Sequence, residues 1–278
     1  MTVARKCSFL LYCASVVLFH QPLGRAQDMP QFQGKHVPLS ERPRISGKSQ
    51  TFLCEWRRKS DLLRKDMYDR YPTMHRKERI SVVRNAGAAV ITQSGTGTFE
   101  EFSTKTVISH DDIQFDTPPL TESSDKKLFL FGRAAATALG YWSIAERPAM
   151  QGSEPSMPAW RDPVFVSAVS RVIGQKRAEE LLDLEVSGID MSNVSFADER
   201  NAYLQEVNRS VASHCTLNKR WAKEECITNA LGWTLYDRDT GLVVEQDIMF
   251  TLLTGDGLAS RVAATWREKL SCQRVPGP

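Results

Sequence analysis

Four of the six cysteines are the residues whose number and spacing point most directly to chemistry; the other two, Cys7 and Cys13, lie in the apolar start of the chain. Cys54, Cys215, Cys226 and Cys272 all follow the apolar start of the chain. An even number in an exported chain favours disulfide bridges, and four cysteines allow three pairings. Proximity favours Cys215–Cys226, which leaves Cys54–Cys272 to join the first and last ordered segments. A zinc site of four thiolates is the alternative, but the Cys-x-x-Cys pairs typical of such sites are absent.

The sequence His110-Asp111-Asp112 offers residue types used in acid–base catalysis. Imidazole titrates near neutral pH, and carboxylates can orient it or complete a metal site together with His75 or His214. Adjacent residues of an extended chain point to opposite sides, however, so a solvated turn is the simpler interpretation. His110 and Asp111 therefore stand as acid–base candidates, while no catalytic residue, cofactor or metal ligand is predicted.

Motifs of the common enzyme classes are absent from the chain. It contains no Gly-x-Ser-x-Gly, His-Glu-x-x-His, Walker or Gly-x-Gly-x-x-Gly sequence. The spacing Ser-x-x-Lys occurs within residues 123–127, but without the Ser-Asp-Asn and Lys-Thr-Gly elements that accompany it in penicillin-recognising enzymes. The sequence leaves open whether the protein is an enzyme.

A basic segment covers residues 56–79, which contain nine Lys and Arg residues but only four Asp and Glu residues. A helical stripe of apolar residues predicts a helix over 61–71, ended by Pro72. Its cations could bind an anionic envelope component, and the predicted binding residues are Arg57, Arg58, Arg64 and Lys65. The alternative is a solvated helix whose i,i+4 ion pairs offset one another.

Residues 1–26 have the layout of a secretory signal peptide. Arg5 and Lys6 precede a mostly apolar run over 7–19, and the small Gly24 and Ala26 suit a cleavage site after Ala26. The run is too short to span a bilayer, and no later stretch approaches 18 apolar residues. The sequence thus predicts an exported protein, periplasmic or secreted, without a transmembrane span after cleavage.

Removing the signal peptide changes the charge balance. Its three basic residues leave 33 Lys and Arg against 33 Asp and Glu, so the mature chain is formally neutral. Neutrality argues against a nucleic-acid partner. The hydrophobic content of 41% is that of a globular protein with a substantial core.

The first half of the mature chain is predicted to be rich in strands. Residues 27–50 form an irregular N-terminal segment, and a β-rich lobe covers 51–145. Its strands are predicted over 80–83, 88–94, 98–108 and 113–115, separated by turns at 85–87, 95–97 and 110–112. Residues 116–127 are a polar loop, and 128–144 fit either a strand followed by a helix or a hairpin.

A connector with three prolines covers residues 146–162 and is the predicted boundary of the second part, 163–278. Asp162 and Pro163 predict the start of a helix that is interrupted at Gly174 and ends near residue 186. Ser195 and Asp198 have capping-box spacing, which predicts a second helix. Its apolar face would comprise Phe196, Tyr203, Leu204, Val207 and Val211.

The C-terminal part is again predicted to be sheet, with strands over 226–236, 242–253 and 258–272 and turns at 239–241 and 255–257. The predicted fold class is therefore α+β. A curled, mostly antiparallel β-sheet is built from both ends of the chain, with the central helices packed on it. The sequence leaves open whether 51–145 and 163–278 form one domain.

Such a fold leaves a concave, partly apolar face. We therefore predict a non-catalytic binding or carrier protein for a small apolar ligand, a lipid or an envelope component. Two alternatives remain: an envelope interaction protein that uses the basic segment, and a hydrolase of envelope material that uses His110.

Overall fold

The computed structural model describes residues 35–36, 49–63, 73–85, 87–97, 101–117, 119–120, 125–142, 159–182, 185–187, 194–197, 201–215, 224–254 and 261–276. The chain divides into two compact units, residues 1–31 and 32–278, and all described residues belong to the second. The predicted signal peptide over 1–26 lies outside the described residues.

Within the described residues, twelve strands form one antiparallel sheet. They are β1 (Lys35–His36), β2 (Gln50–Leu63), β3 (Met74–Asn85), β4 (Ala88–Gly97), β5 (Phe102–Ser109), β6 (Ile113–Phe115), β7 (Glu185–Ser187), β8 (Val194–Ala197), β9 (Ala202–Cys215), β10 (Glu224–Asp237), β11 (Val243–Thr254) and β12 (Arg261–Val275). Their order is β1-β8-β9-β10-β11-β12-β2-β3-β4-β5-β6, and β7 pairs with β9. The prediction of a mostly antiparallel sheet is confirmed.

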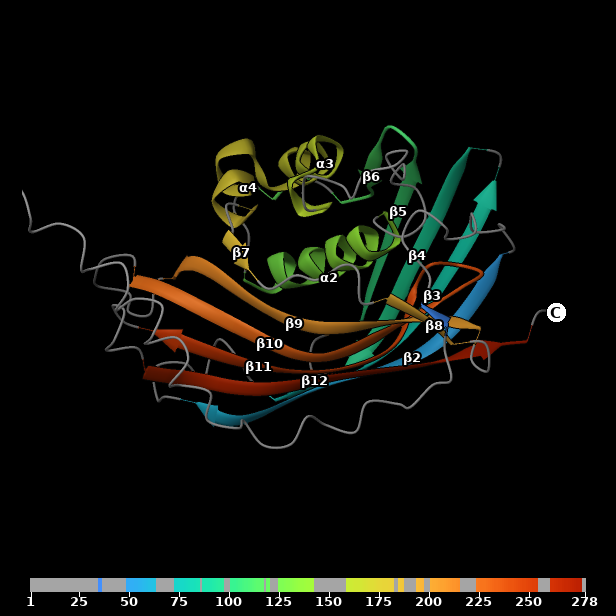
Figure 1. Ribbon diagram of the computed structural model, residues 1–278. Coiled ribbons are helices and arrows are strands. Elements are labelled where there is room, and N and C mark those ends of the chain that lie inside the picture. Colours follow the sequence, from blue (N-terminus) through green and yellow to red (C-terminus); the bar gives the residue numbers. More distant parts are fainter. Residues whose placement is uncertain are drawn as a thin grey trace, which may run out of the picture. The chain divides into compact units, whose positions relative to one another are not determined.

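The pairing of β12 with β2 joins the two ends of the chain (Figure 1). In this ladder Cys272 lies opposite Cys54, and the two cysteines form a disulfide across a sequence separation of 218 residues. The predicted Cys54–Cys272 bridge is confirmed. Cys226 is also disulfide-bonded, but the side chain of Cys215 lies outside the described residues, so the Cys215–Cys226 pairing stays a prediction.

The helices lie between the two series of strands in the sequence. They are α2 (Asp125–Tyr141), the 3₁₀ turn η4 (Ala159–Arg161), α3 (Pro163–Ile173) and α4 (Gln175–Leu182). Asp162 caps α3, because its side chain accepts a hydrogen bond from the backbone N–H of Val164, and Gly174 separates α3 from α4. The predicted start of this helix and its interruption at Gly174 are confirmed.

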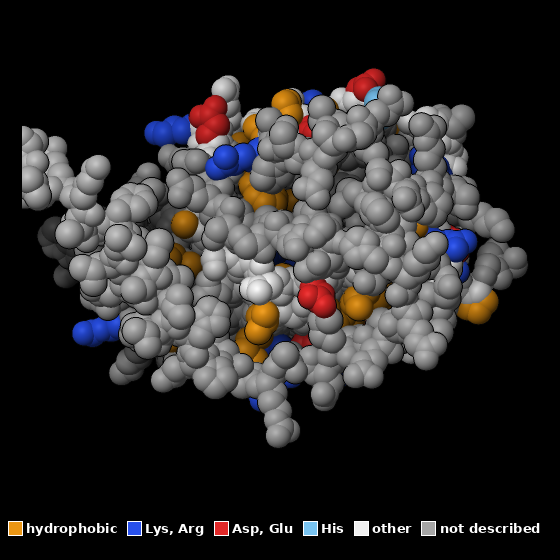
Figure 2. All heavy atoms as spheres, in the orientation of Figure 1, with side chains coloured by type: hydrophobic (Ala, Val, Ile, Leu, Met, Phe, Trp, Pro, Cys, Tyr) orange, Lys and Arg blue, Asp and Glu red, His pale blue; other side chains and the backbone are white. Residues whose placement is uncertain are grey.

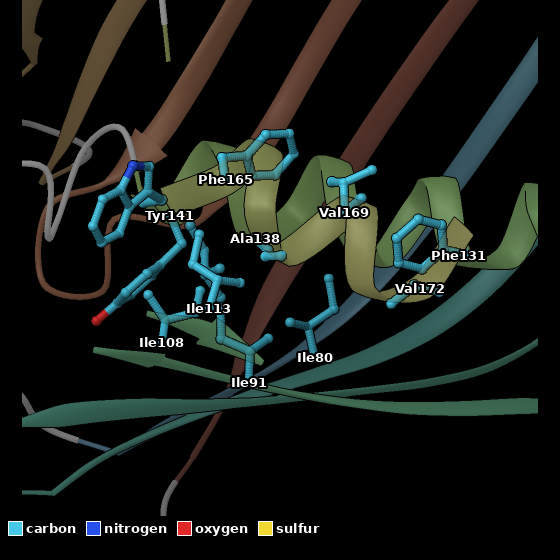
Figure 3. Close-up of a cluster of buried hydrophobic side chains, with 14 of the residues drawn as sticks. Ile80, Ile91, Ile108, Ile113, Phe131, Ala138, Tyr141, Phe165, Val169 and Val172 are labelled. Atoms are coloured by element: carbon cyan, nitrogen blue, oxygen red, sulfur yellow. The ribbon is translucent and has the colours of Figure 1, made fainter. Parts of the chain in front are cut away.

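One cluster of buried side chains contains residues from the strands and from the helices (Figure 3). Alternation along a strand places every second residue on the same side of the sheet. We call the side that carries Trp56, Ile80 and Ile91 the inner face and the opposite side the outer face. From the helices, Phe131, Ala138, Phe165, Val169 and Val172 belong to the same cluster. Among the described residues no helix is long and apolar enough to cross a membrane.

Two predicted helices are wrong where the structure describes them. Residues 61–63 belong to β2, and the rest of the predicted helix over 61–71 lies outside the described residues. The second helix is replaced by β8 and β9. Tyr203, Val207 and Val211 are four residues apart, and this spacing places side chains on one face of a helix and equally of a strand. Pairing with β10 along the whole of β9 decides in favour of the strand.

Two further predictions change. Residues 125–141 are entirely helical, so neither the strand nor the hairpin predicted within 128–144 forms there, and the predicted polar loop is shorter. The turn predicted at 95–97 is the end of β4. Gly95 is paired in the ladders with β3 and β5. The ring of Phe102 occupies the space that a side chain at position 95 would need, since a Cβ atom there would lie 2.6 Å from the ring and 2.5 Å from the carbonyl oxygen of Lys77.

Candidate functional site

A polar cluster on the inner face contains side chains of strands β2–β4 and of helix α2. In the β2–β3 ladder Trp56 lies opposite Arg76 and Cys54 opposite Glu78, so these side chains share one face. Helix α2 contributes Arg133. Trp56, Arg76 and Glu78 are each at most 3% exposed, so charged groups are buried beside Trp56, a member of the larger of the two hydrophobic clusters among the described residues.

Glu78 is the centre of this network. Gln93 Nε2 donates to Glu78 Oε2 at 2.6 Å. Arg76 Nε lies 3.2 Å from Oε1, and Arg133 Nη2 lies 3.4 Å from Oε2. The hydroxyl of Thr137, one turn after Arg133, donates to Gln93 Oε1 at 3.4 Å. A carboxylate in a low-dielectric interior requires such partners, because an unpaired buried charge costs several kcal/mol.

Three arginines stack on aromatic rings of the same face. The guanidinium of Arg133 lies 5.0 Å from the ring centroid of Trp56, and that of Arg58 lies 5.3 Å from the same ring. Arg76 lies 4.1 Å from the ring of Phe102. These distances are typical of cation–π contacts, which keep arginines in place without neutralising them.

Arg58 also binds Glu268 of β12. Its Nη2 donates to Glu268 Oε1 at 2.7 Å, and Trp266 Nε1 donates to the same oxygen at 3.1 Å. Trp56 belongs to the large hydrophobic cluster, and Trp266 belongs to a second one with Phe250 and Leu252. The Arg58–Glu268 pair therefore links the two hydrophobic clusters along the inner face.

The cluster around Trp56 has more positive than negative charge. Arg58, Arg76 and Arg133 face Glu78 and Glu268, which gives three cations against two carboxylates. Burial lowers the pKa of Arg76, Glu78 raises it, and the neighbouring Arg133 lowers it further. Two donors, Trp56 Nε1 and Arg133 Nε, are buried without a hydrogen-bond partner in the described part of the chain. The cluster thus offers positive charge and free N–H groups to an acceptor.

Two of the four predicted partner-binding residues, Arg57 and Arg58, lie on opposite faces of the sheet. Arg57 lies on the outer face, 63% exposed, and binds Glu55, whereas Arg58 points to the inner face and is 15% exposed. They separate because neighbouring residues of a strand point to opposite sides. Arg64 and Lys65 lie outside the described residues, so the predicted patch stays untested.

His110 and Asp111 lie in an exposed turn between β5 and β6. His110 Nε2 is 4.0 Å from Asp111 Oδ1, and Asp112 binds Arg171 of α3 instead. His75 lies elsewhere, on β3, where its Nε2 is 2.5 Å from Glu55 Oε1. Within the described part of the chain, no group of three or more His, Cys, Asp and Glu side chains is placed to hold a metal ion.

A groove of about 940 Å³ lies at the outer face. Its lining contains the hydroxyl groups of Ser94, Thr96, Ser103 and Ser271. It also contains charged residues of both signs, namely Glu55, Lys77, Arg79 and Glu101. The Trp56 cluster lies on the other face of the same strands. On the face shown in Figure 2, described charged side chains are likewise scattered and of both signs.

The inner-face cluster was missed by the sequence analysis, which counted Arg76 among the residues of a basic segment. One signal was present: Arg76 and Glu78 fall in the same alternation as Met74, Ile80 and Val82. A strand that continues this alternation places both charges on the buried side. Gln93 likewise continues the alternation of Ala89 and Ile91. Arg133 carries no such signal, because only the position of α2 brings it to the cluster.

The comparisons with known proteins provide no family for this chain: no protein-family model matches it, and no curated protein matches it significantly.

Proposed function

We propose that the protein is an exported, non-catalytic binding or carrier protein for a small apolar molecule or lipid, held between helix α2 and the inner face of the sheet. In this proposal the central helices cover a curled sheet and the ligand lies beneath them. One observation carries it: within the described residues, Trp56 Nε1 and Arg133 Nε are buried donors without acceptors, and Trp56 belongs to the hydrophobic cluster that strands and helices share.

The physical argument concerns the free energy that a bound ligand would contribute at this site. A buried donor without an acceptor costs about 1–3 kcal/mol. A ligand with one acceptor would remove this cost, and its apolar part would gain about 25 cal/mol for each Å² removed from water. Both contributions favour a molecule with a large apolar body and a small polar end.

Export is supported by two features. The first 26 residues have the pattern of a signal peptide, and the Cys54–Cys272 disulfide is typical of proteins that fold in an oxidising compartment.

Binding of a neutral apolar fluorescent probe, N-phenyl-1-naphthylamine, tests the proposal. We expect saturable binding to the purified mature protein, and native mass spectrometry of material that was never delipidated should show a retained small molecule. Ala138→Phe should weaken probe binding at least tenfold, because Ala138 of α2 is 1% exposed within the helix–strand cluster. Circular dichroism establishes that this variant folds.

Val83→Phe is the matched control. Val83 lies on the outer face and is 41% exposed, so the same kind of enlargement should leave probe binding unchanged. Absence of saturable probe binding to the wild type would refute the carrier function.

A second candidate function is binding of an anionic envelope polysaccharide in the outer groove. Lys77 and Arg79 are exposed neighbours on the outer side of β3, line the groove, and have no ion-pair partner among the described residues. Retention on a polygalacturonate column tests it. Lys77→Ala with Arg79→Ala should abolish retention, whereas Lys176→Ala with Arg261→Ala, which removes the same charge elsewhere, should not.

A further inference from the structure

We infer that the ligand of the inner face is an anionic amphiphile, whose carboxylate or phosphate is held by Trp56 Nε1 and the guanidinium of Arg133. This inference rests on the carrier function proposed above and specifies the chemical class of its ligand. It starts from the imbalance between donors and acceptors around Trp56.

The two carboxylates of the cluster are already engaged. Glu78 is contacted by Gln93, Arg76 and Arg133, and Glu268 by Arg58 and Trp266. Among the described residues, Trp56 Nε1 and Arg133 Nε are buried N–H donors without an acceptor. A ligand that satisfies them must accept hydrogen bonds, so an ammonium group is excluded by its chemistry.

Charge separates an anion from a neutral acceptor. The guanidinium groups of Arg58, Arg76 and Arg133 carry three positive charges near Trp56, and only two carboxylates, Glu78 and Glu268, are paired with them. Electrostatic attraction is stronger in such a low-dielectric site than in water, so a negative group gains more there than a hydroxyl group does.

The exposed fractions indicate how the ligand is oriented. The side chains of Arg133, Arg58 and Glu268 are 20%, 15% and 14% exposed, while Trp56 is 1% exposed. Solvent therefore reaches the part of the charged cluster formed by Arg133, Arg58 and Glu268, but not Trp56. The polar end of the ligand enters beside Arg133, and its chain extends into the hydrophobic cluster that contains Phe131 and Ala138.

Four ligands with the same twelve-carbon chain test the inference by displacing N-phenyl-1-naphthylamine. They are dodecanoate, dodecyl phosphate, dodecanol and dodecylamine. Charge-assisted hydrogen bonds are about twice as strong as neutral ones, so we expect at least one of the two anions to bind at least tenfold more tightly than dodecanol, and dodecylamine to bind more weakly than dodecanol. The two anions compared with each other show whether the site prefers a carboxylate or a phosphate.

Two variants locate the effect. Trp56→Phe removes the indole N–H but keeps an aromatic ring, and Arg133→Gln removes the charge; each should reduce the preference for the anion over dodecanol to within about threefold, a ratio measured within the same variant. Arg171→Gln, an exposed arginine on α3 that is 50% exposed, is the control and should retain the full preference.

The outcomes separate the two proposals. Equal binding of dodecanoate, dodecyl phosphate and dodecanol by the wild type overturns the inference but leaves the carrier function intact, as does a preference that survives both Trp56→Phe and Arg133→Gln. Failure of the wild type to bind the neutral probe or any of the four ligands overturns both.

Discussion

Arg133 of helix α2 stacks on Trp56 of strand β2, with its guanidinium 5.0 Å from the centroid of the indole ring. The same guanidinium reaches Glu78 of β3 at 3.4 Å. One side chain therefore connects a helix to two strands of the sheet. This contact places positive charge beside a tryptophan N–H that has no acceptor, and this pair of donors is the basis of the proposed ligand site.

Glu78→Gln tests the buried charge network. The substitution removes the carboxylate that faces the buried Arg76 and the partly buried Arg133, so both cations lose this partner. Breaking a buried ion pair in this way costs about 3–5 kcal/mol, and urea unfolding should show a loss of this size. Glu55→Gln, at a half-exposed ion pair on the outer face, is the control and should leave the unfolding curve unchanged. Equal curves for the two variants would contradict the prediction.

The Cys54–Cys272 disulfide should contribute strongly to stability. It closes a loop with a sequence separation of 218 residues, and chain-entropy models give at most about 5 kcal/mol for so long a loop. Replacing both cysteines by alanine should lower the free energy of unfolding by up to this amount. The double variant is preferable to a reducing agent, because Cys226 is disulfide-bonded as well. A variant as stable as the wild type would show that this bridge has no stabilising role.

Asp112 should make stability depend on pH. The hydrogen bond from Gln114, and then that from Arg171, lower the pKa of Asp112 below its ordinary value of 3.8, although burial opposes them. A carboxyl with a lowered pKa in the folded state stabilises the protein fully above its pKa in the unfolded chain. This contribution is lost as the pH falls through the folded-state value.

The melting temperatures of the wild type and Asp112→Asn measure this effect. The wild type should melt higher at pH 7, and the difference should shrink below pH 4. The pair with Arg171 is partly exposed, so the difference corresponds to no more than about 1 kcal/mol. A difference that stays constant down to pH 2.5 would assign it to a cause other than the charge.

Gly95→Ala should destabilise the sheet. The added Cβ atom would meet the carbonyl oxygen of Lys77 at 2.5 Å and the ring of Phe102 at 2.6 Å. Overpacking of this kind costs about 1–3 kcal/mol. Gly132→Ala on α2 has no atom within 4 Å of its new Cβ atom, and should stabilise the helix by about 0.5–1 kcal/mol. Opposite signs for the two glycines are expected in thermal unfolding.

Local patterns in the sequence were sufficient for part of the fold. The alternation of residues in β3, β10 and β12 predicted strands, because one face of these strands is buried and the other is exposed. Asp162 and Pro163 predicted the start of α3, because an N-cap and a first-turn proline act within a few residues.

Other elements were beyond local patterns. The spacing of Tyr203, Val207 and Val211 satisfies both a helix and a strand, and only the pairing of β9 with β10 selects the strand. The candidate site has the same origin, since Trp56, Glu78 and Arg133 come from three elements that meet only in the folded chain.

By itself, the amino-acid sequence predicted export from a signal-peptide pattern, and it determined the abundance of strands and the set of cysteines available for pairing. The tertiary structure decided that Cys54 pairs with Cys272, that Arg57 and Arg58 lie on opposite faces, and that the guanidinium of Arg133 lies beside Trp56. The physical reason is the sequence separation over which each kind of interaction acts. Turns, caps and alternation act between near neighbours in the chain, whereas sheet order and helix position depend on contacts between distant segments.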